Sequence, residues 1–244
     1  MTYSPEFFAK RHALAKVSAS LILESFCQVF RPTSVLDLGC ATGIWLAEAK
    51  RKGVGKVLGI DGPWVPMELL EIGESEFMMH DLGESDPQEI SRFDAAFCIE
   101  VAEHLAPESG DRVIAFMAAH TDVVLFSAAI PGQGGTGHIN EQPQSYWFEK
   151  FDINGFDCFD LIRPGLWDDS EVNVIYKQNM VVYVRRKTEM YDRLLASKPV
   201  ERPIVTGFDL NRVHPELFVL RANALPRCSF GSMVKRLWNA LRRR

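Results

Sequence analysis

The sequence lacks a long apolar run, a C-x-x-C pair and an internal repeat, and each absence excludes a class of protein. A helix that spans a bilayer needs about 18 or more consecutive apolar residues. The five cysteines are odd in number, which argues against a disulfide framework, and their spacing argues against a zinc ribbon. Glu6, Lys10 and Arg11 lie near the start, with no apolar segment or cleavage site after them, unlike a signal peptide. We therefore expect a globular protein of the reducing cytoplasm.

Basic residues are scarce in most of the chain and concentrated at its end. Residues 1–187 contain 16 Lys and Arg against 27 Asp and Glu, whereas residues 188–244 contain 11 against 5. An acidic body binds polyanions poorly, so nucleic acid is not the expected partner. Residues 231–244 place apolar and basic side chains on opposite faces of a helix, which is typical of contact with the inner face of an anionic membrane. The alternative is a terminal helix docked on the domain or a frayed basic tail. The sequence indicates no oligomeric state.

Short β-rich segments alternate with helical ones between residues 33 and 130, the pattern of a mostly parallel sheet with helices on both faces. The expected strands are residues 34–38, 56–60, 76–80, 93–99, 123–127, 156–162 and 180–184. They predict a seven-stranded, Rossmann-like α/β fold. We divide the chain into an N-terminal helical lid or flank (1–30), a main domain (31–187) and a basic C-terminal extension (188–244). Ala13, Val17, Leu21 and Phe26 are expected on the apolar face of the N-terminal helix.

The strongest motif is an apolar strand followed by D-x-G-x-x-x-G, which ends at Gly43. Glycines at a strand-to-helix turn let the backbone approach a ligand, and the N–H groups of the helix N-terminus can bind a carboxylate. The spacing differs from the G-x-G-x-x-G of dinucleotide-binding proteins, which disfavours NAD. We predict a cofactor site at Asp37, Gly39, Cys40 and Gly43.

Acidic residues follow three further strands at their carboxyl ends. Asp61 lies 24 residues after Asp37, close to the separation at which a carboxylate accepts hydrogen bonds from ribose hydroxyls. Asp81 follows the third strand and can accept from an exocyclic amine, and Glu100 follows the fourth. The carboxyl ends of the strands in an open α/β sheet share one edge, where ligands bind. These side chains are therefore expected around one ligand.

These segments resemble the class I S-adenosylmethionine-dependent methyltransferases. The resemblance covers residues 33 to 130 through VLDLGCATG, GIDG, HDL and FDAAFCIEVAEHL. FSAAIPGQGGTGHINEQPQSYW and VIYKQNMVVYV are similar to a bacterial stand-alone subfamily, several of whose members are associated with cell-surface sugar or secondary-metabolite pathways. It implies S-adenosylmethionine as cofactor and S-adenosylhomocysteine as product. By this resemblance the methionine end would contact Asp37, Gly39 and Gly43, the ribose Asp61 beside Gly62, and the adenine Asp81 with Leu82, while Ile99 and Glu100 would close the site.

Two histidines are candidates for the base that a hydroxyl acceptor needs, since a hydroxyl is a weak nucleophile and imidazole titrates near neutral pH. His138 follows directly after a glycine-rich loop, residues 131–137, and Glu141 lies three residues further on. We predict that this pair is catalytic. Loop anchoring is the alternative. His104, just past the fourth strand, is either a base or substrate ligand or a hydrogen-bonded helix-face histidine.

The predicted function is O-methylation of a sugar, a glycan or another polar small molecule. Tyr146 and Trp147 are predicted to stack on a ring of this acceptor, with a buried aromatic pair as the alternative. N-methylation of a small molecule and a non-catalytic partner subunit that binds S-adenosylmethionine are the other functions considered.

A metal-dependent alternative uses some of the same side chains. Glu100, Glu103, His104 and His138 offer oxygen and imidazole ligands to a divalent ion. The E-x-x-E-H run is similar to that of the metal-dependent RNA 2′-O-methyltransferases of bacterial RNA repair. That family has a second adjacent histidine where this chain has Leu105, so we expect a site without a metal.

Overall fold

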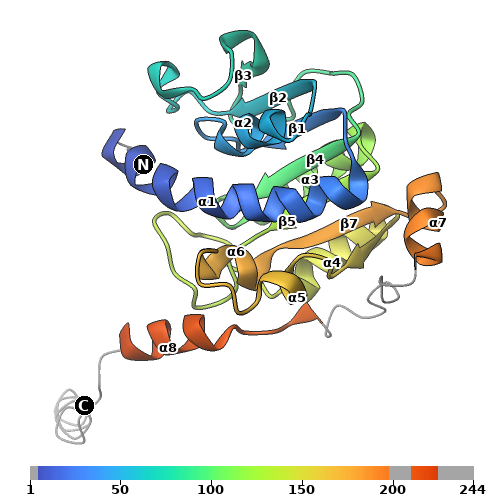
Figure 1. The fold of residues 1–244 in the computed structure, drawn as a ribbon. Coiled ribbons are helices and arrows are strands. Elements are labelled where there is room, and N and C mark those ends of the chain that lie inside the picture. Colours follow the sequence, from blue (N-terminus) through green and yellow to red (C-terminus); the bar gives the residue numbers. More distant parts are fainter. Residues whose placement is uncertain (1–4, 198–209, 225–244) are drawn as a thin grey trace, which may run out of the picture.

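The computed structural model describes residues 5–197 and 210–224, which form a three-layer α/β domain (Figure 1). Seven strands make one sheet in the order β3-β2-β1-β4-β5-β7-β6. The strands are β1 (Ser34–Leu38), β2 (Lys56–Asp61), β3 (Phe77–Met79), β4 (Ala95–Ile99), β5 (Val123–Ser127), β6 (Phe156–Phe159) and β7 (Val181–Arg185). The pairs from β3 through β5 are parallel, and β7 is antiparallel to both β5 and β6. The predicted Rossmann-like, mostly parallel sheet is confirmed.

Helices cover both faces of this sheet. They are α1 (Pro5–Phe30), α2 (Ile44–Arg51), α3 (Pro107–His120), α4 (Gln144–Ile153), α5 (Arg163–Leu166), α6 (Val174–Asn179), α7 (Glu189–Ala196) and α8 (Pro215–Ala224), with short 3-10 turns η1 (Met67–Leu69), η2 (Glu74–Glu76) and η3 (Ala102–His104). Residues of α1, α2 and α7 share one apolar cluster with the sheet, and residues of α3 and α4 share the other. The interfacial helix predicted over residues 231–244 lies outside the described residues.

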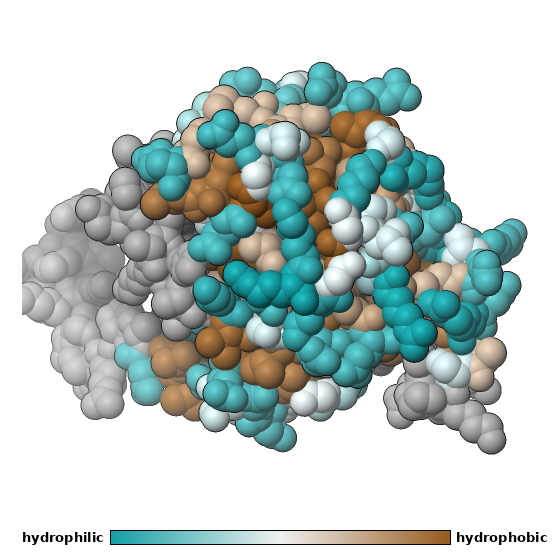
Figure 2. Space-filling view, turned by 45° about the horizontal axis from the view of Figure 1, so that its top comes forward, coloured by the Kyte–Doolittle hydropathy of each residue, from teal (hydrophilic) through white to brown (hydrophobic). Residues whose placement is uncertain are grey.

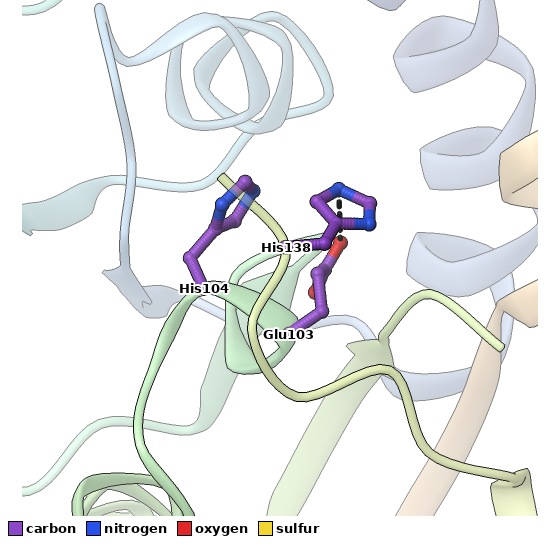
Figure 3. Close-up of side chains that lie close together, drawn as sticks. All are labelled: Glu103, His104 and His138. Atoms are coloured by element: carbon purple, nitrogen blue, oxygen red, sulfur yellow. Dashed lines mark ion pairs between the residues drawn. The ribbon is translucent and has the colours of Figure 1, made fainter. Parts of the chain in front are cut away.

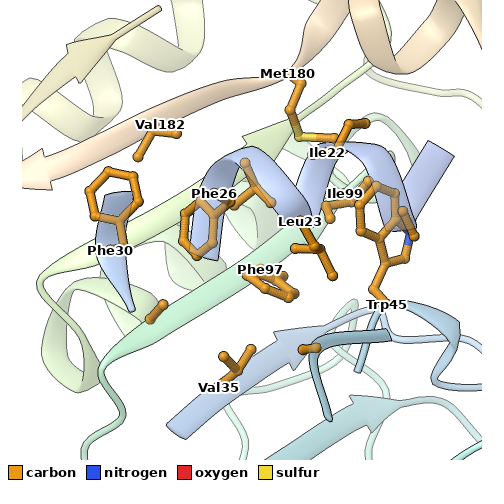
Figure 4. Close-up of a cluster of buried hydrophobic side chains, with 14 of the residues drawn as sticks. Ile22, Leu23, Phe26, Phe30, Val35, Trp45, Phe97, Ile99, Met180 and Val182 are labelled. Carbon is orange, nitrogen blue, oxygen red and sulfur yellow. The ribbon is translucent and has the colours of Figure 1, made fainter. Parts of the chain in front are cut away.

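Helix α1 is a layer of the core and not a lid. Its side chains Ile22, Leu23, Phe26 and Phe30 point at the sheet, toward residues of β1, β4 and β7 (Figure 4). The helix buries Ala15, Ala19, Ile22, Phe26 and Phe30, which recur at intervals of three or four residues. Val17 falls outside this stripe and is 46% exposed, so its predicted place on the apolar face was wrong. The N-terminal flank and the main domain therefore share one core.

Strand β4 begins at Ala95 and not at the predicted residue 93, because Asp94 is occupied elsewhere. Its Oδ2 atom accepts hydrogen bonds from the backbone N–H and the hydroxyl of Thr33, at 2.7 and 2.6 Å, and from the N–H of Ser34 at 3.1 Å. The carboxylate thus fastens the start of β1 to the start of β4. This is the structural role that an acidic residue at a strand start can fill.

The described residues contain no helix with both the length and the apolarity needed to cross a bilayer. The face drawn in Figure 2 is mostly hydrophilic, with apolar surface gathered chiefly in its upper half. Cys27, Cys40, Cys98 and Cys158 carry free thiols, and all but Cys27 are buried. These three buried thiols act as small core side chains.

Candidate active site

A cleft of about 420 Å³ opens where β1, β2 and β4 end. Six residues predicted to bind the cofactor line it, namely Gly39, Asp61, Gly62, Asp81, Leu82 and Glu100. Four other predicted residues do not line it, namely Asp37, Cys40, Gly43 and Ile99. The sequence reasoning missed several lining residues, among them Ala41, Trp64, Gly83, Val101, Leu105, Ser109 and Ile139. Most of these adjoin a motif residue, so adjacency is the signal that could have found them.

The turn after β1 needs glycine at its first position. Gly39 has φ +79°, and a Cβ built there would lie 2.4 Å from Cγ2 of Val101. Both the left-handed backbone and the close approach exclude a side chain. Gly43 has φ +81° and precedes α2. A Cβ built at Gly43 would lie 2.9 Å from Cγ1 of Ile72. Gly39 therefore shapes the floor of the cleft, whereas Gly43 shapes the start of α2 behind it.

We expect Gly39→Ala to lower the free energy of unfolding by about 2 kcal/mol, about half from the backbone conformation and half from the clash. Gly53→Ala is the matched control, because Gly53 has φ +98° but no atom within 4 Å of its Cβ position. The control should cost only about 1 kcal/mol. Urea unfolding measures both variants, and equal losses would contradict the predicted clash with Val101.

Asp61 organises the wall of the cleft. Its Oδ2 atom accepts from the N–H of Ala41 at 2.7 Å, and its Oδ1 atom accepts from the N–H of Gly62 at 2.7 Å and the indole N–H of Trp64 at 2.9 Å. Burial raises the pKa of Asp61 even though these three bonds favour the charged form. A carboxylate has about four lone-pair sites, so at least one is left for a ligand hydroxyl.

Asp37 lies behind the lining, 1% exposed. Burial and then the nearby charge of Asp61 raise the pKa of Asp37 well above its usual value. Its Oδ2 atom is buried without a hydrogen-bond partner among the described residues. A carboxylate that is buried and lacks a partner is expensive to charge, and a cationic ligand nearby would lower that cost.

The pKa of Asp37 predicts how stability depends on pH. A carboxyl group with a raised pKa keeps its proton in the folded protein after the unfolded chain has lost it, so it costs stability as pH rises above 3.8. We expect Asp37→Asn to stabilise the protein without cofactor, with a gain that grows as the pH rises from acid to neutral. Urea unfolding across this range measures the gain.

Asp94→Asn is the control of opposite sign. Burial alone would raise the pKa of Asp94, but the hydrogen bonds from Thr33 and Ser34 lower it. Asp94 therefore stabilises the fold when charged. Asp94→Asn should destabilise the protein at neutral pH and have little effect in acid. The same pH trend in both variants would refute this assignment.

Glu100 is held in the wall by two amides. Its backbone has φ +55°, and its carboxylate accepts from Nε2 of Gln133 and from Nδ2 of Asn179, each at 3.0 Å. These bonds join the end of β4 to the glycine-rich loop and to α6. Glu100 is thus a wall residue, and it is not a member of the cluster described next.

Glu103, His104 and His138 converge beside the cleft (Figure 3). Glu103 and His104 lie on η3, which follows β4, and His138 comes from the glycine-rich loop. The carbonyl of Glu103 accepts from the N–H groups of Ile139 and Asn140, at 2.9 and 3.0 Å, which fixes the loop on η3. Oε1 of Glu103 lies 3.9 Å from Nε2 of His138, and the two imidazole rings meet edge to face at 4.8 Å. His104 also lines the cleft.

Glu141 orients His138. Its Oε1 atom lies 2.8 Å from Nδ1 of His138, and its carboxylate also accepts from the N–H groups of Gly132 and Gly134 at 2.8 and 2.6 Å. Burial alone would raise the pKa of Glu141, but these three partners lower it. The carboxylate therefore anchors the loop and directs Nε2 of His138 toward Glu103. The catalytic role of the pair stays a prediction.

Tyr146 and Trp147 do not reach the cleft. Trp147 is 1% exposed and packs against Phe126, with ring centroids 5.6 Å apart, and its predicted stacking on a substrate was wrong. Helix α4 turns this side chain into the core, where its large apolar area is best buried. Tyr146 meets Trp147 edge to face at 4.9 Å and lies under Lys150. Trp147 is thus buried, as in the alternative prediction, whereas Tyr146 is only half-buried.

Comparison with known proteins shows what this chain resembles. Residues 9–127 match the family model described as a methyltransferase domain. The ubiquinone biosynthesis O-methyltransferase of Neisseria meningitidis serogroup C (strain 053442) is 30% identical over 127 residues, which are 48% of this chain and 48% of that protein. The chain therefore spans about half the length of the curated relative that it matches.

Two solved structures show the same fold. An O-methyltransferase family protein from Burkholderia thailandensis has a TM-score of 0.54 and 12% identity, with 75% of this chain and 58% of that one covered. CalS10, an amino pentose methyltransferase from Micromonospora echinaspora, also has a TM-score of 0.54, with 13% identity and 76% and 98% covered. Residues 9–127 thus resemble a methyltransferase domain, and the chain has the fold of these two proteins.

Proposed function

We propose that this protein transfers the methyl group of S-adenosylmethionine to a hydroxyl of a sugar, a glycan or another polar small molecule. The observation that carries the proposal is the placement of His138, Glu103 and His104 beside the cleft of a methyltransferase fold. An O-methyltransferase and an amino pentose methyltransferase among the similar proteins support the reaction and the kind of acceptor.

The residues of the cleft fit this cofactor. Gly39 lines the cleft without a side chain, and Asp61 keeps a free acceptor site for a ribose hydroxyl. The unpartnered Oδ2 atom of buried Asp37 favours a cationic molecule, and S-adenosylmethionine carries a sulfonium and an ammonium group. Asp81 and Leu82 line the cleft where an adenine would be bound. When bound, the cofactor supplies an activated methyl group.

The protein's own part in the reaction is to position the acceptor and take up its proton. In-line displacement needs the acceptor oxygen opposite the sulfur, and much of the rate comes from this placement. The cluster of Glu103, His104 and His138 is the polar group beside the cleft that can draw the proton from the hydroxyl. Glu141 keeps His138 in position for this step.

The charge of the cleft limits the acceptor. Its lining carries Asp61, Asp81 and Glu100 but no lysine or arginine among the described residues. A phosphate group or an RNA strand needs cations or N–H donors for binding. The acceptor we propose is therefore a small molecule or glycan without a phosphate at the reacting end. Free thiols at Cys40, Cys98 and Cys158 support work in the reducing cytoplasm.

Isothermal calorimetry with S-adenosylmethionine and S-adenosylhomocysteine tests the proposal first. We expect binding of both ligands. With S-adenosylmethionine labelled in its methyl group, we also expect transfer of the label onto neutral sugars or onto hydroxyl compounds in cell extracts. Absence of heat with either ligand would refute the assignment. Binding without transfer to any acceptor would instead support a non-catalytic partner subunit.

A further inference from the structure

We propose that Glu103, His104 and His138 bind one divalent transition-metal ion, such as zinc. Each residue offers one donor atom, and the three atoms lie within 4.8 Å of one another. This departs from the expectation of a site without a metal, and it removes Glu100 from the ligand set because two amides hold that carboxylate.

The donors converge with little freedom to move apart. Zinc binds nitrogen and oxygen at about 2 Å, which sets neighbouring donors about 3.3 Å apart in a tetrahedral site. Nε2 of His138 and Oε1 of Glu103 are already 3.9 Å apart. Their side chains are 7% and 1% exposed, and the loop is fixed on η3 by two backbone hydrogen bonds to Glu103. Small side-chain rotations would complete the site.

The hydrogen bond from Glu141 sets the nitrogen that faces the ion. Because a carboxylate only accepts hydrogen bonds, Nδ1 of His138 carries the proton at its 2.8 Å contact with Glu141. In the neutral imidazole, Nε2 then presents a lone pair toward Oε1 of Glu103. An ion between these two atoms could bind both. A carboxylate that holds the outer nitrogen of a histidine is the usual support of a metal ligand.

The donor set selects the kind of metal. Two imidazoles with one carboxylate is a ligand set of catalytic zinc and of other divalent transition metals, which keep open positions for water or substrate. Magnesium and calcium prefer sites made of oxygen atoms. His104 lines the cleft, so the open positions would face the bound acceptor.

The role of the ion rests on the proposed function. With the ion bound, the three side chains would no longer take up the proton themselves. The ion would lower the pKa of a bound hydroxyl, so that its O–H bond breaks and the proton passes to water. The oxygen then forms a bond to the methyl carbon while the carbon–sulfur bond breaks and its electron pair stays on sulfur. The ion would also fix the position of the reacting hydroxyl.

Cobalt titration of the full chain, without an affinity tag and stripped by chelator, tests the proposal. We expect visible absorption bands that saturate at one ion per chain, that zinc abolishes and that magnesium leaves unchanged. Glu103→Gln, His104→Ala and His138→Ala should each weaken cobalt binding by about 100-fold or more. His120→Ala is the matched control, because His120 ends α3 outside the cluster and should leave binding unchanged.

Calorimetry with S-adenosylhomocysteine on the same samples separates the two proposals and verifies that each variant is folded. Absence of cobalt bands in protein that binds S-adenosylhomocysteine would overturn the metal site alone. Cobalt binding that survives all three substitutions would also overturn it. Cobalt binding without any affinity for S-adenosylhomocysteine would uphold the site and refute the proposed function.

Discussion

Asp61→Ala is expected to weaken S-adenosylhomocysteine binding by about 100-fold or more, equivalent to about 2.7 kcal/mol. The carboxylate positions the N–H of Ala41 and the indole of Trp64, both of which line the cleft, and it is the acceptor we assign to the ribose. Hydrogen bonds to a charged group contribute about 1.5 to 3 kcal/mol each, so loss of the ribose contact and of the wall accounts for this effect. Calorimetry of the purified variant measures it.

The fold should survive this substitution. Burial raises the pKa of Asp61, which means that the fold disfavours its charge, and its removal relieves that cost. Asp86→Ala is the control, since this exposed carboxylate near the same edge touches Arg112 only at 3.6 Å. The control should bind S-adenosylhomocysteine like the parent protein. Unchanged binding by Asp61→Ala, with the same melting temperature, would show that the cofactor does not use this wall.

The order of elements could be read from the sequence because the strands of a parallel sheet are short apolar runs between helical segments. The expected residues 34–38 and 123–127 coincide with β1 and β5. The failures have physical causes. Asp94 accepts hydrogen bonds from the start of β1, so β4 begins only after it. The apolar residues of α1 recur at two competing spacings, and the structure buries the set that includes Ala19 and Ile22.

The candidate site could be predicted where chemistry depends on neighbours in the sequence. The pairing of His138 with Glu141 follows from a spacing of three residues, and Asp61 follows from the end of a strand. The approach of His138 to Glu103 could not be predicted, because it depends on the backbone of a glycine-rich loop and on hydrogen bonds to a distant turn. The place of Trp147 could not be predicted, because an aromatic residue serves a core and a ligand equally well.

His138→Ala is expected to lower kcat for a hydroxyl acceptor by about 100- to 1000-fold, while the KM for S-adenosylmethionine changes by no more than about twofold. His138 belongs to the cluster that draws the proton from the acceptor, and it does not line the cleft that we assign to the cofactor. Without it the hydroxyl must ionise by itself, so the activity of the variant should increase more steeply with pH than that of the parent. Steady-state rates across neutral and alkaline pH measure both effects.

Two companion variants separate chemistry from loop structure. Glu141→Gln leaves the imidazole in place but replaces the charged acceptor of Gly132 and Gly134, so it should lower kcat less than His138→Ala. His120→Ala, which alters a histidine outside the cluster, should leave kcat unchanged. If His138→Ala kept full activity, the acceptor atom would need no help in losing its proton. An amine behaves in this way, and that result would replace the hydroxyl acceptor by an amino group.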